Sequence, residues 1–405
     1  MIKMTPESLR QLTNVPTSLR IAGRGILNSR KGKLVVELPD GRKLLFDHGE
    51  PGPSAELHLT NYSVFSKALN GGDVGFAESY MDGDWTTSNL TKVLEFFSEN
   101  FDAAGNLAIG RKFVRFANMV RHFFNRNSRS GAKRNIEAHY DLGNDFYEAW
   151  LDPSMTYSSA VFTDTNTSLE QAQAVKYQTI CETLSIGPNS RVLEIGCGWG
   201  GFAEYAASNY GAHITCLTLS SEQQEYAVAR IARADLADRV DIRLQDYRDH
   251  EGQYDCVASI EMFEAVGEQY WPDYFQKLDS FLEPGGRAAL QIITMRDDLF
   301  SRYRKRADFI QRYVFPGGML PSHSRLLSEF SNAQLNFEGA TNFADDYAET
   351  LRRWSDSFNA QWNKVIEPLG FDLRFRRLWN FYLSYCEAGF RNGRINVGHY
   401  SLVKK

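Results

Sequence analysis

The amino-acid sequence predicts an α/β protein, in which a smaller N-terminal α+β domain precedes a largely parallel sheet. Three observations predict this class. The chain has 405 residues, which is enough for two or three domains. A hairpin pattern lies near its start, and from about residue 135 onward short apolar strands alternate with helical stretches. Such alternation is typical of parallel strands joined by right-handed crossovers.

Composition excludes several other classes. The five cysteines and eight histidines are scattered without a CxxC, HxxxH or HExxH pattern, so the sequence predicts neither a disulfide framework nor a metal site. A net charge of −5 argues against a general nucleic-acid binder. No apolar run reaches about 18 residues, and the N-terminus lacks the apolar core of a signal peptide. We therefore expect a soluble, cytoplasmic protein.

The first domain is expected to span residues 1–125. Residues 19–27 and 33–48 have the pattern of short strands, and Pro39-Asp40-Gly41 within the second run is a hairpin signal. From about residue 61 to 125 the apolar spacing becomes helical. These patterns together predict a small α+β unit.

A basic segment follows. No carboxylate occurs between Asp102 and Glu137, whereas eight lysines and arginines fall in that interval. Residues 108–124 place apolar side chains at helical spacing opposite the cations, as in helices that lie on an anionic membrane surface. The alternative is an ordinary connecting helix with a solvated basic face, followed by a linker over residues 126–136. Both interpretations remain open from this segment alone.

The second domain is expected to span residues 137–405, and its apolar runs predict the strands of the sheet. They are residues 191–195, 213–219, 240–244, 256–260 and 287–294. The first run leads into a glycine-rich loop with Glu194, Gly196, Gly198 and Gly200, and a helical stretch comes next. Glycines at this spacing let the backbone turn sharply and let a ligand approach the N–H groups at the start of the helix.

The loop differs from the GxGxxG pattern of dinucleotide-binding proteins. Those proteins also have an acidic residue at the end of the second strand, where this chain has Thr218. The pattern E-x-G-x-G-x-G instead resembles the first motif of class I S-adenosylmethionine-dependent methyltransferases. That resemblance implies a Rossmann-like sheet of seven strands that binds S-adenosylmethionine.

The resemblance also implies the positions that hold this cofactor. Thr218 and Leu219 end the second strand, where the ribose would lie, and Gln223 on the next helix would reach its hydroxyls. A third strand ends at Asp246 and Tyr247, a carboxylate for the adenine amine and a ring for stacking. The remaining implied cofactor residues are Tyr157, Ser158, Glu194, Gly196, Gly198 and Gly200.

Further blocks narrow the choice of methyltransferase. They are HYDLGNDFY at 139–147, LDPSMTYSSA at 151–160, MFEAVG at 262–267 and FPGGMLPS at 315–322. In this order they resemble the cyclopropane-fatty-acyl-phospholipid synthase family and its mycolic acid relatives. The resemblance implies methyl transfer to the cis double bond of an unsaturated phospholipid acyl chain. It also implies a lipid-binding cap inserted at about residues 296–345.

This chemistry explains the residues that the family requires. An alkene is a weak nucleophile and needs a dry, apolar slot that aligns it with the methyl donor. Transfer leaves a carbocation, which aromatic faces can stabilise. Tyr157, Trp199, Phe263 and Tyr347 are the candidates for that lining. A base must then remove a proton.

In the family this base is a bound bicarbonate held by a small polar shell. Glu264, Tyr347 and the main chain of Ile293 match the shell, whereas Ser159 and Gln291 stand where the family usually has cysteine and histidine. Both can still donate hydrogen bonds to an anion. Without bicarbonate, the carbocation would lose a proton from the chain itself and give a methyl-branched unsaturated or methylene product. We expect methyl transfer, with a cyclopropane ring as the favoured product.

Cys386 matches a cysteine that has been assigned as catalytic in the family. The mechanism needs no thiol nucleophile, and apolar neighbours raise the pKa of a thiol, so a structural role is favoured over a catalytic one. A second basic cluster, at Arg302, Arg304, Lys305 and Arg306, is either a headgroup contact of the cap or a solvated helical face.

The expected partners are phospholipids at the anionic inner face of the membrane, with peripheral association and a homodimer by family analogy. A methyl-branching lipid methyltransferase is the alternative within the class. A non-catalytic membrane-surface binding protein and a small-molecule methyltransferase are alternatives outside it.

Overall fold

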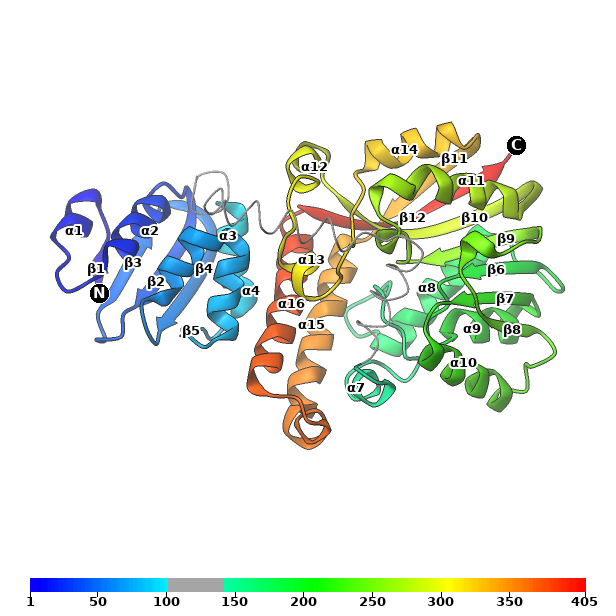
Figure 1. The fold of residues 1–405 in the computed structure, drawn as a ribbon, viewed down its shortest axis with the longest axis horizontal. Helices are drawn as coiled ribbons and strands as arrows, with labels where there is room; N and C mark the ends of the chain where they lie inside the picture. The colour runs from blue at the N-terminus through cyan, green and yellow to red at the C-terminus, as the bar shows by residue number, and fades with distance from the viewer. Residues whose placement is uncertain (101–141) are drawn as a thin grey trace. The chain divides into compact units, whose positions relative to one another are not determined.

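The computed structural model describes residues 1–100 and 142–405 (Figure 1). The described residues form two compact units. The first contains residues 1–100, 305–314 and 367–393, and the second contains residues 142–304, 315–366 and 394–405. The basic helix and the linker expected within residues 108–136 lie outside the described residues, as does the start of the block at 139–147.

The first unit is built on a five-stranded sheet with the order β1-β3-β2-β4-β5. Its strands are β1 (Ile2–Lys3), β2 (Lys31–Glu37), β3 (Lys43–Asp47), β4 (Glu50–Leu59) and β5 (Trp85–Thr86). β2 and β3 are antiparallel and close through the turn at Gly41, whose N–H donates to the Leu38 carbonyl. The predicted hairpin is therefore confirmed.

The helices of the first unit are α1 (Pro6–Gln11), α2 (Thr17–Leu27), α3 (Ser63–Met81), α4 (Leu90–Glu99), α13 (Phe309–Tyr313) and α16 (Leu373–Arg391). The strand predicted at residues 19–27 is wrong, because these residues lie in α2. Leu19, Ala22, Gly23 and Ile26 are buried at helical spacing. A Cβ at Gly23 would lie 2.9 Å from Leu9 Cδ1, so the glycine permits close packing.

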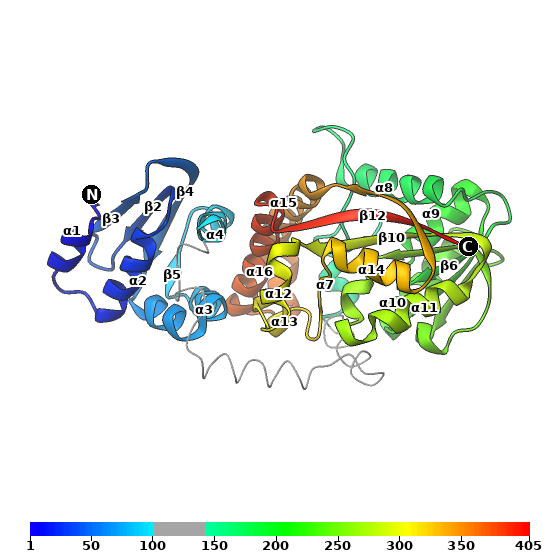
Figure 2. The same ribbon diagram turned by 90° about the horizontal axis from the view of Figure 1, so that it is seen from above.

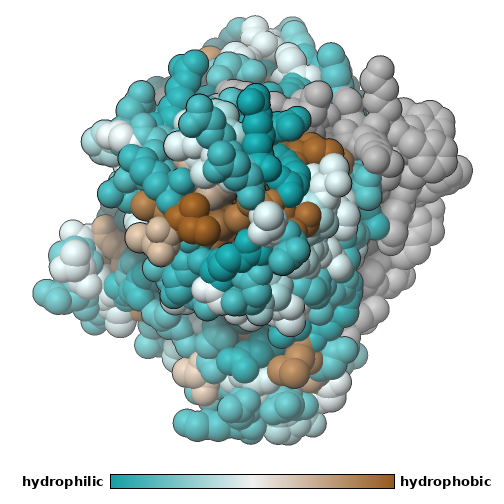
Figure 3. All heavy atoms as spheres, turned by 90° about the vertical axis from the view of Figure 1, so that its left-hand side faces the viewer, coloured by the Kyte–Doolittle hydropathy of each residue, from teal (hydrophilic) through white to brown (hydrophobic). Residues whose placement is uncertain are grey.

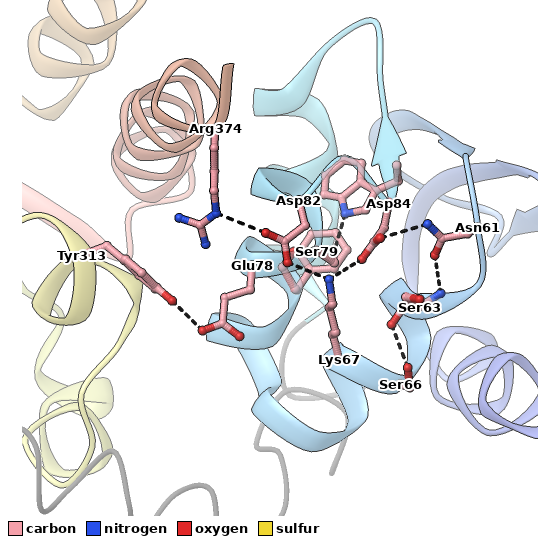
Figure 4. Close-up of polar contacts among 12 residues, drawn as sticks. Asn61, Ser63, Ser66, Lys67, Glu78, Ser79, Asp82, Asp84, Tyr313 and Arg374 are labelled. Atoms are coloured by element: carbon pink, nitrogen blue, oxygen red, sulfur yellow. Dashed lines mark hydrogen bonds and ion pairs between the residues drawn. The ribbon is translucent and has the colours of Figure 1, made fainter. Parts of the chain in front are cut away.

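Two segments from the second half of the chain complete this unit. α16 packs against α4 and α3, and the ring of Phe381 lies 5.9 Å from that of Tyr80. Figure 4 shows polar contacts that bind these segments to α3: Arg374 donates to Asp82 over 3.2 Å, and Tyr313 donates to Glu78 over 2.5 Å. The structure therefore differs from the prediction of one continuous second domain over residues 137–405.

The second unit contains a seven-stranded sheet with the order β11-β12-β10-β9-β6-β7-β8. Its strands are β6 (Arg191–Ile195), β7 (His213–Thr218), β8 (Val240–Leu244), β9 (Tyr254–Ile260), β10 (Leu282–Met295), β11 (Leu335–Asn342) and β12 (Ile395–Lys404). β12 is antiparallel to both of its neighbours, and the pairs from β10 to β8 are parallel. This architecture confirms the predicted α/β class.

Helices cover both faces of this sheet (Figure 1 and Figure 2). The helices of the second unit are α7 (Asn144–Glu148), α8 (Leu169–Thr183), α9 (Gly201–Tyr210), α10 (Ser221–Arg233), α11 (Trp271–Phe281), α12 (Asp297–Tyr303), α14 (His323–Asn332) and α15 (Ala344–Gln361). Because strand side chains alternate, Val192 packs with α8 and α9, whereas Leu193 packs with α11. Short turns of other helix types are η2 (Tyr247–Asp249), η3 (Phe263–Ala265), η4 (Glu268–Tyr270), η5 (Trp362–Ile366) and η6 (Glu367–Leu369).

The structure also corrects the predicted cap. Within residues 296–345, β11 is a strand of the main sheet and α14 packs against it. α13 belongs to the first unit. The segment is therefore not one inserted element with the predicted bounds, because its apolar residues after residue 322 contribute to the core of the second unit.

The surface of the first unit carries few large apolar side chains. Figure 3 shows a mainly hydrophilic face with a small group of apolar side chains. In the first unit, large exposed apolar residues include Met1, Ile2 and Ile21. Among residues 1–100 and 142–405, no helix is long and apolar enough to span a bilayer.

Candidate active site

The glycine loop connects β6 to α9 in a backbone conformation that favours glycine. The φ angles of Gly196, Gly198 and Gly200 are +84°, +52° and +82°. A Cβ at Gly196 would lie 2.7 Å from Met262 Cγ, whereas a Cβ at Gly198 would meet nothing within 4 Å. The loop therefore leaves open space in front of the α9 N-terminus, which is suited to an approaching ligand.

The ends of β6 and β7 carry the next predicted cofactor residues. Glu194 is buried on β6 and accepts from Cys216 Sγ over 3.5 Å, and its burial raises its pKa to about 7. Thr218 ends β7, Leu219 follows it, and Thr218 Oγ1 donates to Gln223 Oε1 over 3.0 Å. The structure thus brings Thr218 and Gln223 together at the carboxyl edge of the sheet, where open α/β folds bind ligands.

The end of β8 carries Asp246 and Tyr247. Asp246 accepts from Arg248 Nε over 2.9 Å, and the Tyr247 ring lies 5.4 Å from that of Tyr274 in an edge-on arrangement. Three neighbouring strands therefore end in the residues that the sequence assigned to S-adenosylmethionine. Their arrangement fits that molecule, while the role of each single residue stays a prediction.

The loop before α8 carries Tyr157, Ser158 and Ser159. Ser158 Oγ accepts from Lys176 Nζ over 2.7 Å. Arg230 Nη1 donates to the carbonyls of Ser154, over 2.7 Å, and of Trp199, over 3.2 Å. The two bonds of Arg230 connect the loop before α8 to the glycine loop.

Aromatic side chains continue from this loop. Tyr147 lies 5.5 Å from Tyr157 and 5.1 Å from Trp199, measured between ring centroids. Trp354 lies 5.4 Å from Tyr157 and 6.2 Å from Tyr347. The structure therefore joins three of the four rings predicted to line the slot.

Phe263 is the exception among these four rings. It is buried in the core beneath α11, with its ring 5.4 Å from that of Trp271 and 5.0 Å from that of Phe275. The structure assigns it to packing, since its neighbours are core side chains rather than the rings around Tyr157.

An acidic side chain that the sequence analysis did not select lies at the centre of the predicted shell. Glu261 follows β9, and its Oε1 accepts from the Ser159 N–H over 2.8 Å and from Gln291 Nε2 over 2.7 Å. Its Oε2 accepts from the Tyr347 hydroxyl over 2.6 Å. The sequence signal that could have identified Glu261 is an acidic residue placed directly after an apolar strand.

Glu264 is the second carboxyl group of the cluster. Its Oε1 accepts from the Ile293 N–H over 2.5 Å, whereas its buried Oε2 has no hydrogen-bond partner among the described residues. Burial, together with the charge of the neighbouring Glu261, raises the pKa of Glu264 to about 8. Glu264 is therefore mainly protonated at neutral pH.

Ser159 and Gln291 are engaged with groups of the protein itself. The Ser159 hydroxyl donates to the Ala160 carbonyl over 3.0 Å, and Gln291 Nε2 also contacts the Ser159 carbonyl at 3.3 Å. Gln291 Oε1 lies 2.9 Å from His399 Nε2. The roles of the serine hydroxyl and the glutamine amide as donors to a bound anion stay predictions.

Two further residues of the cluster were not predicted. His399 pairs with Gln291 across β10 and β12, and burial lowers its pKa to about 3, so its neutral ring orients the Gln291 amide. Lys176 on α8 is fully buried. Burial lowers the pKa of Lys176 to about 7 against the opposing effect of Glu261 and Glu194.

Cys386 lies half-buried on α16, which belongs to the first unit. Its structural role stays a prediction. In the predicted basic cluster, Arg304 pairs with Glu268 over 2.6 Å and Arg306 with Asp73 over 2.7 Å, so these two cations form ion pairs within the protein.

Comparison with known proteins shows the family of the chain. The model of the family described as mycolic acid cyclopropane synthetase matches residues 127–400. The chain belongs to this family. The family prediction made from the sequence motifs is thereby confirmed.

Individual relatives extend the likeness. A tuberculostearic acid methyltransferase of Mycobacterium tuberculosis is 41% identical over 343 residues, covering 82% of this chain and 79% of the relative. The cyclopropane-fatty-acyl-phospholipid synthase of Escherichia coli is 38% identical over 341 residues, covering 83% of this chain and 85% of the relative. A mycolic acid cyclopropane synthase solved with S-adenosylhomocysteine and CTAB has a TM-score of 0.63 at 28% identity, covering 67% of this chain and 98% of that one.

Proposed function

We propose that this protein transfers a methyl group from S-adenosylmethionine to the cis double bond of an unsaturated phospholipid acyl chain and forms a cyclopropane fatty acid. One observation carries the proposal: a cluster of buried acidic and amide groups adjoins an aromatic network in the unit that also bears the glycine loop. Glu261, Glu264, Tyr347 and Gln291 form this cluster. Family membership over residues 127–400 supports the same reaction.

The second unit fits the cofactor that this reaction needs. The open space at Gly198 and the pair formed by Thr218 and Gln223 would hold S-adenosylmethionine at the carboxyl edge of the sheet. This molecule supplies an electrophilic methyl group. Tyr157, Trp199 and neighbouring rings exclude water, so that the alkene is the nucleophile available to it.

The same rings can stabilise the carbocation that methyl transfer forms. Ring contacts connect Tyr147 through Tyr157 and Trp354 to Tyr347, and aromatic faces stabilise positive charge without forming a bond to it. A base must then remove a proton. Bicarbonate is that base in the family, and Ser159, Gln291 and Tyr347, three of the residues predicted to hold it here, all donate to the carboxylate of Glu261.

A methyl-branched unsaturated or methylene product is the second candidate. The observation that favours it is the engagement of two predicted anion donors, since the Ser159 hydroxyl bonds to Ala160 and the Gln291 amide to Glu261. Proton loss from the acyl chain would then leave a double bond. Fragmentation of the isolated product distinguishes this outcome from a ring.

We also propose that the enzyme works in the cytoplasm, at the anionic inner face of the membrane, as a peripheral homodimer. The eight cations without a carboxylate between Asp102 and Glu137 support attraction to anionic lipid. The homodimer rests on the family resemblance. Binding to vesicles with and without anionic lipid, and light scattering in solution, test these two points separately.

The reaction is tested with purified protein, S-adenosylmethionine and phospholipid vesicles. We expect S-adenosylhomocysteine release with monounsaturated phosphatidylglycerol and none with saturated phosphatidylglycerol, because the headgroup is the same and the alkene is missing. Release without vesicles, in the presence of small soluble acceptors, would favour a small-molecule methyltransferase. The absence of release with any lipid would contradict the proposal.

A further inference from the structure

The carboxylate of Glu261 occupies the donor shell that the sequence analysis assigned to an external anion. Three donors point to it: the Ser159 N–H at 2.8 Å, Gln291 Nε2 at 2.7 Å and the Tyr347 hydroxyl at 2.6 Å. Each belongs to a residue that was predicted to hold bicarbonate. The shell therefore already contains one carboxylate that is covalently part of the chain.

The backbone at Glu261 gives an independent indication. Its φ angle is +49°, in the left-handed region that favours glycine. Non-glycine residues kept in that region concentrate at functional sites, because the surrounding structure must hold them there. A glycine would suit the backbone better, so the side chain itself is the reason for a glutamate at this position.

Burial raises the pKa of Glu261, which strengthens its carboxylate as a base. The hydrogen bonds from Tyr347, Ser159 and Gln291 and the charge of the buried Lys176 act in the opposite direction and favour the charged form. Burial also raises the pKa of the neighbouring Glu264, to about 8.

Glu261 also borders the aromatic network. Tyr347, which donates to its Oε2, has its ring 6.2 Å from that of Trp354, and Trp354 adjoins Tyr157 at 5.4 Å. A carboxylate at this place lies next to the rings that would surround the carbocation. It is thus within the part of the site where a proton must be removed.

We propose that Glu261 is the catalytic base of this enzyme and takes the place of bicarbonate. The proposal rests on the methyl transfer proposed above. A C–H bond of the methylated acyl chain breaks, and its proton passes to a carboxylate oxygen of Glu261. If the proton leaves the new methyl group, the electron pair closes the ring onto the cationic carbon. If it leaves a neighbouring carbon, the pair forms a carbon–carbon double bond.

The test compares three proteins in carbon-dioxide-free buffer, with and without added bicarbonate. They are the wild type, Glu261→Gly and the control Asp235→Gly. Asp235 is an exposed acid with a φ of +56° in the same unit, so its replacement makes the same backbone change away from the site. Products are quantified as alkylated lipid, and S-adenosylhomocysteine release is measured in parallel.

We expect the wild type and Asp235→Gly to form product without bicarbonate and to change less than about twofold when it is added. Glu261→Gly should lose about 100-fold or more, which is the typical contribution of a general base. Added bicarbonate should raise the activity of Glu261→Gly to at least about a tenth of the wild-type activity, because the vacated donors can hold the anion. A merely structural role of Glu261 would not produce this rescue.

Two results would overturn the proposal. One is a wild type that needs bicarbonate, and the other is a Glu261→Gly variant that makes the wild-type product at the wild-type rate without it. The wild-type comparison remains decisive even if the variant does not fold. Failure of the proposed function gives a different result, since the wild type would then release no S-adenosylhomocysteine with unsaturated lipid in any buffer.

Discussion

Two glutamates three positions apart meet different surroundings. Glu261 accepts three hydrogen bonds, whereas Glu264 accepts one from Ile293 and has a buried oxygen without a described donor. Hydrogen bonds favour the ionised form of a carboxyl group and burial disfavours it. The pair consequently resembles sites in which one carboxyl is the base and the other stays neutral.

The protonation of Glu264 predicts a pH dependence of stability. Its pKa rises from 4.5 to about 8 on folding, so the native state binds more protons than the unfolded state between these values. The free energy of unfolding of the wild type therefore falls as the pH rises through this window. Glu264→Gln lacks this contribution, so its stability relative to the wild type should increase by on the order of 1 kcal/mol per pH unit.

Denaturant unfolding at several pH values between 4.5 and 8 measures this difference. Glu251→Gln, at an exposed position, is the matched control for the loss of an acid. A Glu264→Gln difference that is flat with pH would show that Glu264 is already charged in the native protein.

Lys176 predicts a large cost for removing one buried charge. Its Nζ donates to Ser158 Oγ over 2.7 Å, and its charge favours the ionised forms of Glu261 and Glu194. Lys176→Met leaves these groups buried without their cation, which should destabilise the protein by about 3–5 kcal/mol. Lys364→Met, at an exposed position, should change stability by less than about 0.5 kcal/mol. Equal midpoints in urea for the two variants would contradict the role of Lys176.

The sequence motifs predicted some residues of the carboxyl cluster and missed others. Motif order predicted Glu264, Tyr347, Gln291 and Ile293, and the structure places all four around the same carboxyl groups. His399, Lys176 and Glu261 carry no local motif. Their roles depend on contacts between distant segments, such as the pairing of Gln291 with His399 across two strands.

Among the elements, the glycine loop shows how a backbone conformation prepares a site. Gly196 and Gly200 meet neighbouring side chains when a Cβ is built on them, whereas Gly198 faces open space. All three have positive φ angles. The conformation is therefore common to the loop, but only Gly198 combines it with room for a ligand.

This difference predicts the effect of Gly198→Ala. Its methyl group would enter the space in front of α9, so S-adenosylmethionine should bind about 10-fold or more weakly. Gly285→Ala is the matched control, because Gly285 has a φ of +78° and also meets nothing within 4 Å. Both variants should lose about 1–2 kcal/mol of stability from the backbone change. Calorimetric titration checks the affinity, and unchanged binding by Gly198→Ala would contradict the assignment.

The elements also show what patterns can predict. β6 and β8 begin and end where their predicted runs do. β6 is largely buried, whereas β8 is the edge strand and keeps only Val240 buried. Residues 19–27 were mistaken for a strand because their apolar side chains fit two periods over so short a length. β11 was missed, since its mostly polar, exposed sequence does not resemble a buried strand.

On the scale of the whole molecule, the two units are discontinuous along the chain. α16 lies far from α3 and α4 in sequence and yet packs against both, and Thr91 donates to Glu387 over 2.9 Å. Local sequence patterns do not predict packing between segments this far apart in the chain. The linear domain boundaries predicted from composition therefore differ from the units of the structure.

The return of α16 predicts that it stabilises the first unit. Phe381 is buried against Phe309 at 4.8 Å and Tyr80 at 5.9 Å, so Phe381→Ala should cost about 3–5 kcal/mol. Leu373→Ala, at a position of α16 that is 59% exposed, should have little effect. Hydrogen exchange should show lost protection in α3 and α4 of Phe381→Ala. Loss confined to the seven-stranded sheet would contradict this division.

The central claim is methyl transfer to an unsaturated acyl chain, and mass spectrometry of lipids tests it most directly. The acyl chains of a host without its own synthase are compared with and without this protein, and the derivatives are separated and fragmented. We predict monounsaturated chains heavier by one methylene group, with a saturated ring in place of the double bond. Acyl chains of unchanged mass would contradict the account.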